Sequence, residues 1–96
     1  MSRRRYLVCY DIADEKRLRR VARVLKEYGR RLQYSVFECP LADVGLIRLQ
    51  ADLLKVIDQD EDQVMFVSLG PEFGAGKDVI TTIGLPYLEW PRLTIV

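Results

Sequence analysis

The sequence has no histidine and only two cysteines among its 96 residues, and both shortages narrow the chemistry open to it. Without an imidazole, Ser-His-Asp and Cys-His catalysis are excluded, so any enzyme on this chain must use carboxylates, a metal ion, tyrosine, lysine or arginine. Cys9 and Cys39 are too few for a disulfide scaffold and fit no zinc-binding pattern. We therefore expect two buried free thiols, since free cysteine behaves as a small hydrophobic side chain.

Long hydrophobic runs are also missing. No apolar run reaches the roughly 18 residues that a transmembrane helix needs. The apolar stretch near the N-terminus is short, lacks a small-residue cleavage site and ends at Asp11, so it predicts a β-strand rather than a signal peptide. We expect a cytoplasmic protein of one domain with no membrane contact. A chain of this length buries only about 60% of the surface that it exposes when unfolded, so its stability as a monomer is marginal. Oligomerisation commonly adds the missing buried surface.

The formal net charge of +1 conceals an uneven distribution of charge along the chain. Residues 1–34 carry 11 basic and 4 acidic side chains, a net +7, whereas the remainder carries 4 basic and 10 acidic ones, a net −6. Most of the basic residues lie on or beside one predicted helix, over residues 14–28. This pattern indicates either a polyanion partner for the N-terminal half or a solvated helix face.

The stretch RYLVCYDI, residues 5–12, predicts a strand that is apolar on both of its faces. One face carries Leu7 and Cys9, and the other carries four apolar side chains, Tyr6, Val8, Tyr10 and Ile12. A strand of this kind is buried on both faces. In so small a domain the helices can cover only one face, and a partner subunit is the simplest cover for the other.

Hydrophobic periodicity predicts an alternation of strands and helices along the chain. We expect Asp14 to cap the first helix and Gly29 to end it, and Asp43 to cap the second helix. The predicted elements are a strand over 5–12, a helix over 14–28, one bent or two short strands over 31–39 stopped by Pro40, a helix over 43–57, an acidic turn over 58–62 and a strand over 63–69. The order βαββαβ predicts an α+β, ferredoxin-like domain over residues 1–78.

The tail, residues 79–96, ends in the short apolar stretch RLTIV. This stretch, residues 92–96, is too short to pack alone. We expect it to add a C-terminal edge strand to the chain's own sheet or to that of a second copy in a two-fold homodimer. The preceding loop, GPEFGAGKD, is not a phosphate-binding loop, because Pro71 and Asp78 stand where that motif needs glycine and serine or threonine.

Asp11 ends the apolar strand on a carboxylate, directly before the basic helix. A charged carboxylate in such a place is costly without a partner. Near a two-fold axis it would face its own copy, and a divalent cation relieves the repulsion between two such groups. A bound Mg²⁺ would then activate water against a phosphodiester held by the basic helix. The alternative is an ion pair between Asp11 and a nearby arginine.

Three stretches taken in order, YLVCYDI, a basic helix ending in KEYG, and RLQYSVFEC, resemble CRISPR-associated protein 2, the small adaptation protein that works with the CRISPR integrase. The resemblance covers residues 5–69, and IGLP with the final apolar strand is similar to many members. It implies a homodimer with the two sheets packed on each other and a Mg²⁺ site at Asp11, facing its mate across the dimer. It also implies a metal-dependent endonuclease acting on single-stranded RNA or double-stranded DNA.

The resemblance also implies roles for individual residues. Tyr10 belongs to the same motif as Asp11, and Arg31 and Phe37 match positions that the family associates with nuclease function. On the basic helix the candidates for nucleic-acid binding are Lys16, Arg17, Arg19, Arg20 and Arg23.

Two functions from different classes remain open. In the first, the protein is a Mg²⁺-dependent endonuclease that uses Asp11. In the second, it is a non-catalytic dimeric scaffold that holds a DNA duplex on its basic face and the integrase by its C-terminal tail. A toxin-type ribonuclease on the same fold is a third interpretation.

Overall fold

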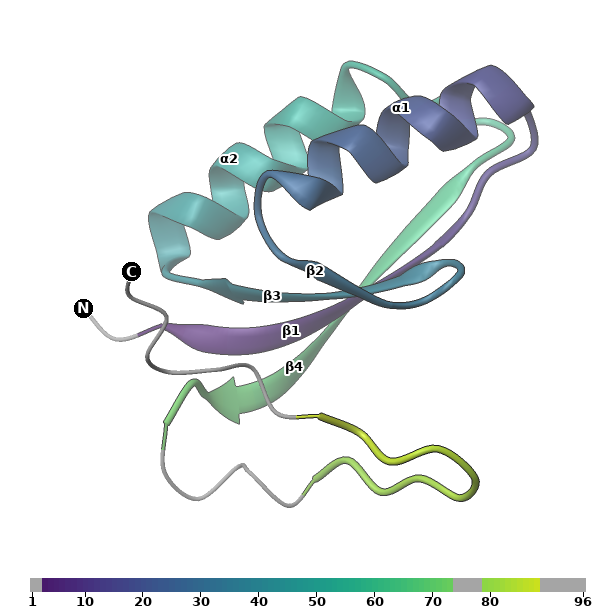
Figure 1. Ribbon diagram of the computed structural model, residues 1–96. Helices are drawn as coiled ribbons and strands as arrows, with labels where there is room; N and C mark the ends of the chain where they lie inside the picture. Colours follow the sequence, from purple (N-terminus) through teal and green to yellow (C-terminus); the bar gives the residue numbers. More distant parts are fainter. Residues whose placement is uncertain (1–2, 74–78, 89–96) are drawn as a thin grey trace.

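A four-stranded antiparallel sheet carries both helices on one of its faces (Figure 1). The structure is a computed structural model that describes residues 3–73 and 79–88. Its elements are β1 (Arg4–Asp11), α1 (Glu15–Lys26), β2 (Arg30–Gln33), β3 (Val36–Leu41), α2 (Asp43–Leu54) and β4 (Gln63–Pro71). This order confirms the predicted ferredoxin-like α+β fold.

The strand order β2-β3-β1-β4 places β1 between β3 and β4, antiparallel to both. The ladder with β3 covers residues 4–9 of β1, whereas the ladder with β4 continues to the last residue, Asp11, which lies opposite Gln63. The position of Asp11 therefore depends on β4 and on the loop that leads into it.

The core lies between the sheet and the two helices. Every second residue of β1 enters it, because side chains alternate across a strand, and Tyr6, Val8 and Tyr10 are buried. The helices supply the facing side chains at helical spacing, namely Val21, Ala22, Leu25, Leu49 and Leu53. Each large apolar side chain buried in this way stabilises the fold by about 1.5–3 kcal/mol.

Helix α1 begins at the predicted cap. The Asp14 carboxylate accepts a hydrogen bond from the backbone N–H of Arg17 at 2.9 Å, and this bond lowers the pKa of Asp14 from its ordinary value. The helix ends at Lys26, two residues before the predicted end, and Gly29 lies directly before β2. A Cβ on Gly29 would lie 2.2 Å from the Glu38 carbonyl oxygen, so only glycine allows this approach.

Helix α2 differs from the prediction at both ends. Ala42 is the N-cap and makes no side-chain cap bond, so the predicted cap, Asp43, is instead the first helical residue, where an acidic group still interacts favourably with the helix dipole. The helix ends at Leu54 rather than at 57. The N–H groups of Val56 and Ile57 both bond to the Leu53 carbonyl, which ends the regular ladder.

The predicted strand character over 31–39 belongs to two short strands joined by a turn at 34–35. The predicted stop at Pro40 is wrong, because β3 continues to Leu41 and Pro40 lies opposite Arg5 of β1. On its other side β3 pairs with β2 only as far as Glu38. Pro40 thus lies beyond the neighbouring strand, and such an edge position tolerates a residue without an N–H.

The face of the sheet away from the helices is only partly covered, and we call it the open face. Leu7 and Cys9 of β1 are half-buried there, and Met65 and Val67 of β4 are 49% and 42% exposed. Residues 79–88 lie on this side of the sheet (Figure 1). The predicted edge strand, residues 92–96, lies outside the described residues. In the described ranges no helix has the length and apolar character needed to cross a bilayer.

Candidate functional site at the end of strand β1

Asp11 is exposed at the carboxyl end of β1. Because side chains alternate along the strand and Tyr10 faces the core, Asp11 projects from the open face. The ion pair with a nearby arginine, which was the alternative interpretation, is absent over residues 3–73 and 79–88. Within this part of the chain the carboxylate remains available to a ligand or to a second copy.

The other three residues with an expected nuclease role lie together, but on the helix side of the sheet. The Tyr10 and Phe37 ring centres are 6.2 Å apart, and the Arg31 guanidinium lies 5.2 Å from the centre of the Phe37 ring. The Tyr10 hydroxyl donates to the Tyr34 carbonyl oxygen at 3.2 Å, which ties β1 to the hairpin turn. Phe37 is fully buried and Tyr10 is nearly so, and Arg31 is exposed. Catalytic roles for these residues stay predictions, and their packing supports the sheet from the face opposite Asp11.

Helix α1 presents most of its basic side chains to solvent. We call this exposed set the α1 basic face: Lys16, Arg19, Arg20, Arg23 and Lys26. Arg17, also a candidate for nucleic-acid binding, instead reaches the loop before β4, where its Nε lies 2.8 Å from the Asp62 carboxylate and its Nη2 lies 3.1 Å from that of Glu61. Of the five candidates on this helix, four are therefore exposed and Arg17 is engaged within the chain.

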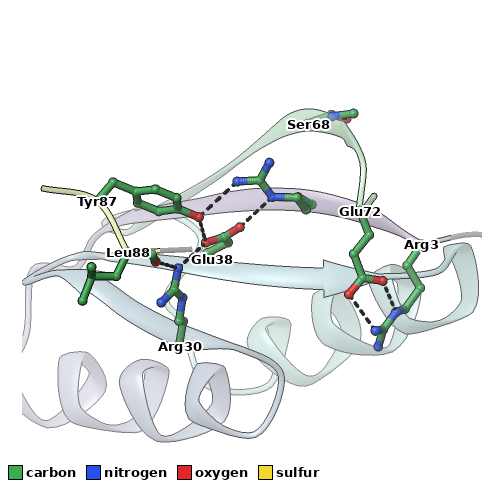
Figure 2. A network of polar contacts seen from close by, with 9 residues as sticks. Arg3, Arg30, Glu38, Ser68, Glu72, Tyr87 and Leu88 are labelled. Carbon is green, nitrogen blue, oxygen red and sulfur yellow. Dashed lines mark hydrogen bonds and ion pairs between the residues drawn. The ribbon is translucent and has the colours of Figure 1, made fainter. Parts of the chain in front are cut away.

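Glu38, a buried carboxylate on the open face, was not among the residues predicted from the sequence. It accepts hydrogen bonds from Arg5 Nε at 2.7 Å, from the Tyr87 hydroxyl at 2.6 Å and from Arg30 Nη2 at 3.2 Å. Figure 2 shows Tyr87 on the side of the sheet away from the helices, with Arg30 also donating to the Leu88 carbonyl oxygen. The signal in the sequence was a glutamate inside the apolar strand VFECPL, because a buried charge requires a partner.

The Glu38 network shifts the ionisation of its members. Burial opposes the charged carboxylate, but the hydrogen bonds from Tyr87, Arg5 and Arg30 outweigh it and leave the pKa of Glu38 below its ordinary value. The pKa of Tyr87 is raised, first by burial and then by its bond to Glu38. Both groups therefore keep their ordinary charge near neutral pH, and the network ties the tail to the sheet.

The two cysteines are free, as predicted, but only Cys39 is fully buried. Burial raises the pKa of its thiol to about 12, with a smaller effect of the Glu38 charge. Cys9 is half-buried on the open face. The deeply protonated Cys39 thiol is a packing group rather than a nucleophile.

Comparison with known proteins identifies the family. A family model described as CRISPR associated protein Cas2 matches residues 4–72. The chain belongs to the Cas2 family. A CRISPR-associated endoribonuclease Cas2 from Thermodesulfovibrio yellowstonii is 52% identical over 64 residues, which make up 67% of this chain and 70% of that protein.

Solved Cas2 structures share the fold. The crystal structure of Streptococcus pyogenes Cas2 at pH 6.5 matches with a TM-score of 0.66 and 33% identity, over 83% of this chain and 99% of that one. A chain of a partial Cas6-RT-Cas1–Cas2 complex matches with a TM-score of 0.73 and 26% identity, over 97% of this chain and 99% of that one. The βαββαβ arrangement is therefore the one found in Cas2 proteins.

This Cas2 chain offers a single carboxylate at the expected metal position. No three His, Cys, Asp or Glu side chains come together to hold a metal ion in the part of the chain that the structure describes. Mg²⁺ usually takes only one or two protein carboxylates and completes its shell with water and phosphate oxygens. An exposed Asp11 with no ion pair in the described ranges fits that requirement, with or without the Asp11 of a second copy.

Proposed function

We propose that this Cas2 protein is a Mg²⁺-dependent endonuclease that hydrolyses phosphodiester bonds in single-stranded RNA or double-stranded DNA. The observation that carries the proposal is the exposed carboxylate of Asp11 at the end of a central strand. When bound there, Mg²⁺ supplies Lewis-acid charge to a phosphate oxygen and lowers the pKa of a coordinated water. The similarity to a protein named an endoribonuclease supports this class of reaction.

The proposed working form is a homodimer in which two open faces pack together. Apolar side chains on this face, among them Met65 and Val67, are exposed in the single chain and would be buried by a second copy. Asp11 projects from the same face, so packing about a two-fold axis would bring the two carboxylates toward each other. Burying apolar area and sharing a cation would then favour the same dimer.

The α1 basic face is the proposed contact for the nucleic-acid backbone. Exposed arginine and lysine side chains bind phosphates with little dependence on sequence and release counterions as they do so. The helix follows Asp11 within a few residues, so a backbone held along it would pass close to the carboxylate. Arg31, exposed at the edge of the sheet, would contribute a further cation.

The same basic face favours a second function, a non-catalytic scaffold that holds a DNA duplex and the CRISPR integrase. This function requires the α1 basic face and leaves Asp11 idle. It is supported by the likeness to a chain from a Cas6-RT-Cas1–Cas2 complex. The integrase contact is proposed for the C-terminal tail, whose Tyr87 is tied to the sheet through Glu38.

The deciding experiment is Mg²⁺-dependent cleavage of single-stranded RNA and duplex DNA by the wild-type protein and Asp11→Ala, with chelator controls. We expect Asp11→Ala to lose about 10²-fold or more in rate while DNA binding persists, because a lost metal site forfeits several kcal/mol of transition-state stabilisation. Asp60→Ala, which removes another exposed carboxylate, is the matched control and should retain the wild-type rate. A wild-type protein that does not cleave, or cleavage indifferent to Asp11, would leave the scaffold function.

A further inference from the structure

Asp62, the last residue before β4, is a buried carboxylate with a full set of donors. Its side chain is 0% exposed. One oxygen accepts from the backbone N–H of Ala13 at 2.9 Å and from Arg17 Nη2 at 3.2 Å. The other accepts from the backbone N–H of Asp58 at 2.8 Å and from Arg17 Nε at 2.8 Å. Such a carboxylate is strongly held in its charged form, and the pKa of Asp62 lies far below its usual range, chiefly because of Arg17.

These bonds connect segments that converge on Asp11. Ala13 lies in the turn between β1 and α1, two residues after Asp11, and Arg17 lies in the first turns of α1. Gln63, the residue that follows Asp62, is the ladder partner of Asp11 in β4. Asp62 is thus connected to Asp11 indirectly and in two ways, through the β1–β4 ladder and through the turn that follows β1.

Arg17 differs from the cations of the α1 basic face in its exposure and in its contacts. Its side chain is 22% exposed, and its planar guanidinium makes two bonds to Asp62 and one to Glu61. A bidentate pair with a carboxylate fixes geometry as well as charge, and lysine cannot reproduce it. These contacts suit a residue that holds a turn in place better than one that must reach for a phosphate.

We infer that Asp62 and Arg17 are positioning residues that fix the turn after β1 and so hold the Asp11 carboxylate in its place on the open face. The inference deepens the proposed function and rests on Asp11 being the metal-binding carboxylate. Loss of the Asp62 carboxylate would weaken its bond to Ala13 and release the Arg17 guanidinium. Asp11, at the open end of its strand, would then sample positions that bind a cation less tightly.

The test compares three full-length variants with the wild type: Asp62→Asn, the milder Arg17→Lys, and Asp52→Asn as the matched control. Asp52 accepts a 2.6 Å hydrogen bond from Tyr28 at the other end of α1, so its substitution also turns a bonded carboxylate into an amide. Amide hydrogen exchange over residues 11–14 reports the turn, and electron paramagnetic resonance of added Mn²⁺ reports cation binding without nucleic acid.

We expect Asp62→Asn to speed exchange at Ala13 and to weaken Mn²⁺ binding by about tenfold or more each, in line with the loss of charge-assisted bonds. Arg17→Lys should show both effects less strongly, and Asp52→Asn should show neither. The inference is overturned if Asp62→Asn leaves the turn as protected as in the wild type, or if the turn loosens and Mn²⁺ affinity does not change.

Failure of the underlying function gives a different result. The metal role of Asp11 is refuted if the wild-type protein binds no Mn²⁺, or if the Asp11→Asn variant binds Mn²⁺ as tightly as the wild type. Hydrogen exchange then decides alone whether Asp62 and Arg17 hold the turn. If Asp62→Asn does not fold, Arg17→Lys provides the same two measurements.

Discussion

Replacing Glu38 with alanine would remove the carboxylate that Arg5, Arg30 and Tyr87 share at the open face. The side chains of Glu38 and Arg5 are 2% and 9% exposed, so the Arg5 guanidinium would stay buried and lose its ion pair with Glu38. Removing one partner of a buried ion pair costs about 3–5 kcal/mol. We expect a loss of about 3 kcal/mol in the free energy of unfolding, because the Arg30 side chain is 25% exposed and solvent screens its attraction to Glu38.

This loss is large for a small domain. At roughly 0.05–0.15 kcal/mol per residue, the whole fold is stable by about 5–14 kcal/mol. A loss of about 3 kcal/mol corresponds to a fall in Tm of roughly 12–24 °C for a chain of this size. Urea unfolding followed by circular dichroism, at one protein concentration for all variants, measures the change directly.

The matched control is Glu72→Ala. Glu72 accepts two 2.7 Å bonds from Arg3, but the Arg3 side chain is 51% exposed, so we expect a cost of about 0–1 kcal/mol. The double variant Glu38→Leu with Arg5→Met should recover much of the loss, since it removes both members of the buried pair. If Glu38→Ala costs no more than Glu72→Ala, the reasoning from burial is wrong.

Two further predictions concern acid and salt. The folded-state pKa of Glu38 is lowered, so its contribution to stability is present above its ordinary pKa of 4.5 and is lost as the pH falls through the folded value. Glu38→Gln should therefore make the free energy of unfolding less dependent on pH on the acid side. Urea titrations from pH 7 downward measure this, and a pH dependence parallel to that of the wild type would contradict it. Replacing Arg19, Arg20 and Arg23 with alanine should reduce the slope of log K against log salt for duplex DNA by about 0.9 for each phosphate that the helix no longer neutralises. Arg48→Ala, which removes an exposed arginine from α2, should leave the slope unchanged, and an equal effect of both would contradict DNA binding by α1.

The fold could be predicted from local patterns where a single interaction dominates. Asp14 caps α1 as expected, because a carboxylate directly before an amphipathic stretch meets the free N–H groups of the first turn. The prediction that Pro40 ends the strand was wrong, because the cost of proline in a strand depends on whether a neighbouring strand needs its backbone N–H for pairing. That information lies in the sheet and not in the residue.

The site could be predicted only in part, for a related reason. The motif places Tyr10 and Asp11 side by side in the chain, yet strand alternation sends Tyr10 into the core and Asp11 to the open face. Arg17 resembles one more cation of a basic helix until the loop before β4 is folded against it. Its position on the helix face does not reveal that the buried carboxylate of Asp62 lies there.

The sequence by itself determined the type and order of the elements and the basic character of α1, because these follow from residues that are close together in the chain. A short run that is apolar on both faces predicted β1, and helical spacing predicted α1. Only the tertiary structure decided which charged groups meet. Glu38 joins Tyr87, and Asp62 joins Ala13, each across 49 residues of sequence. Such pairs depend on sheet register and loop packing, which bring distant residues together without any local pattern to indicate them.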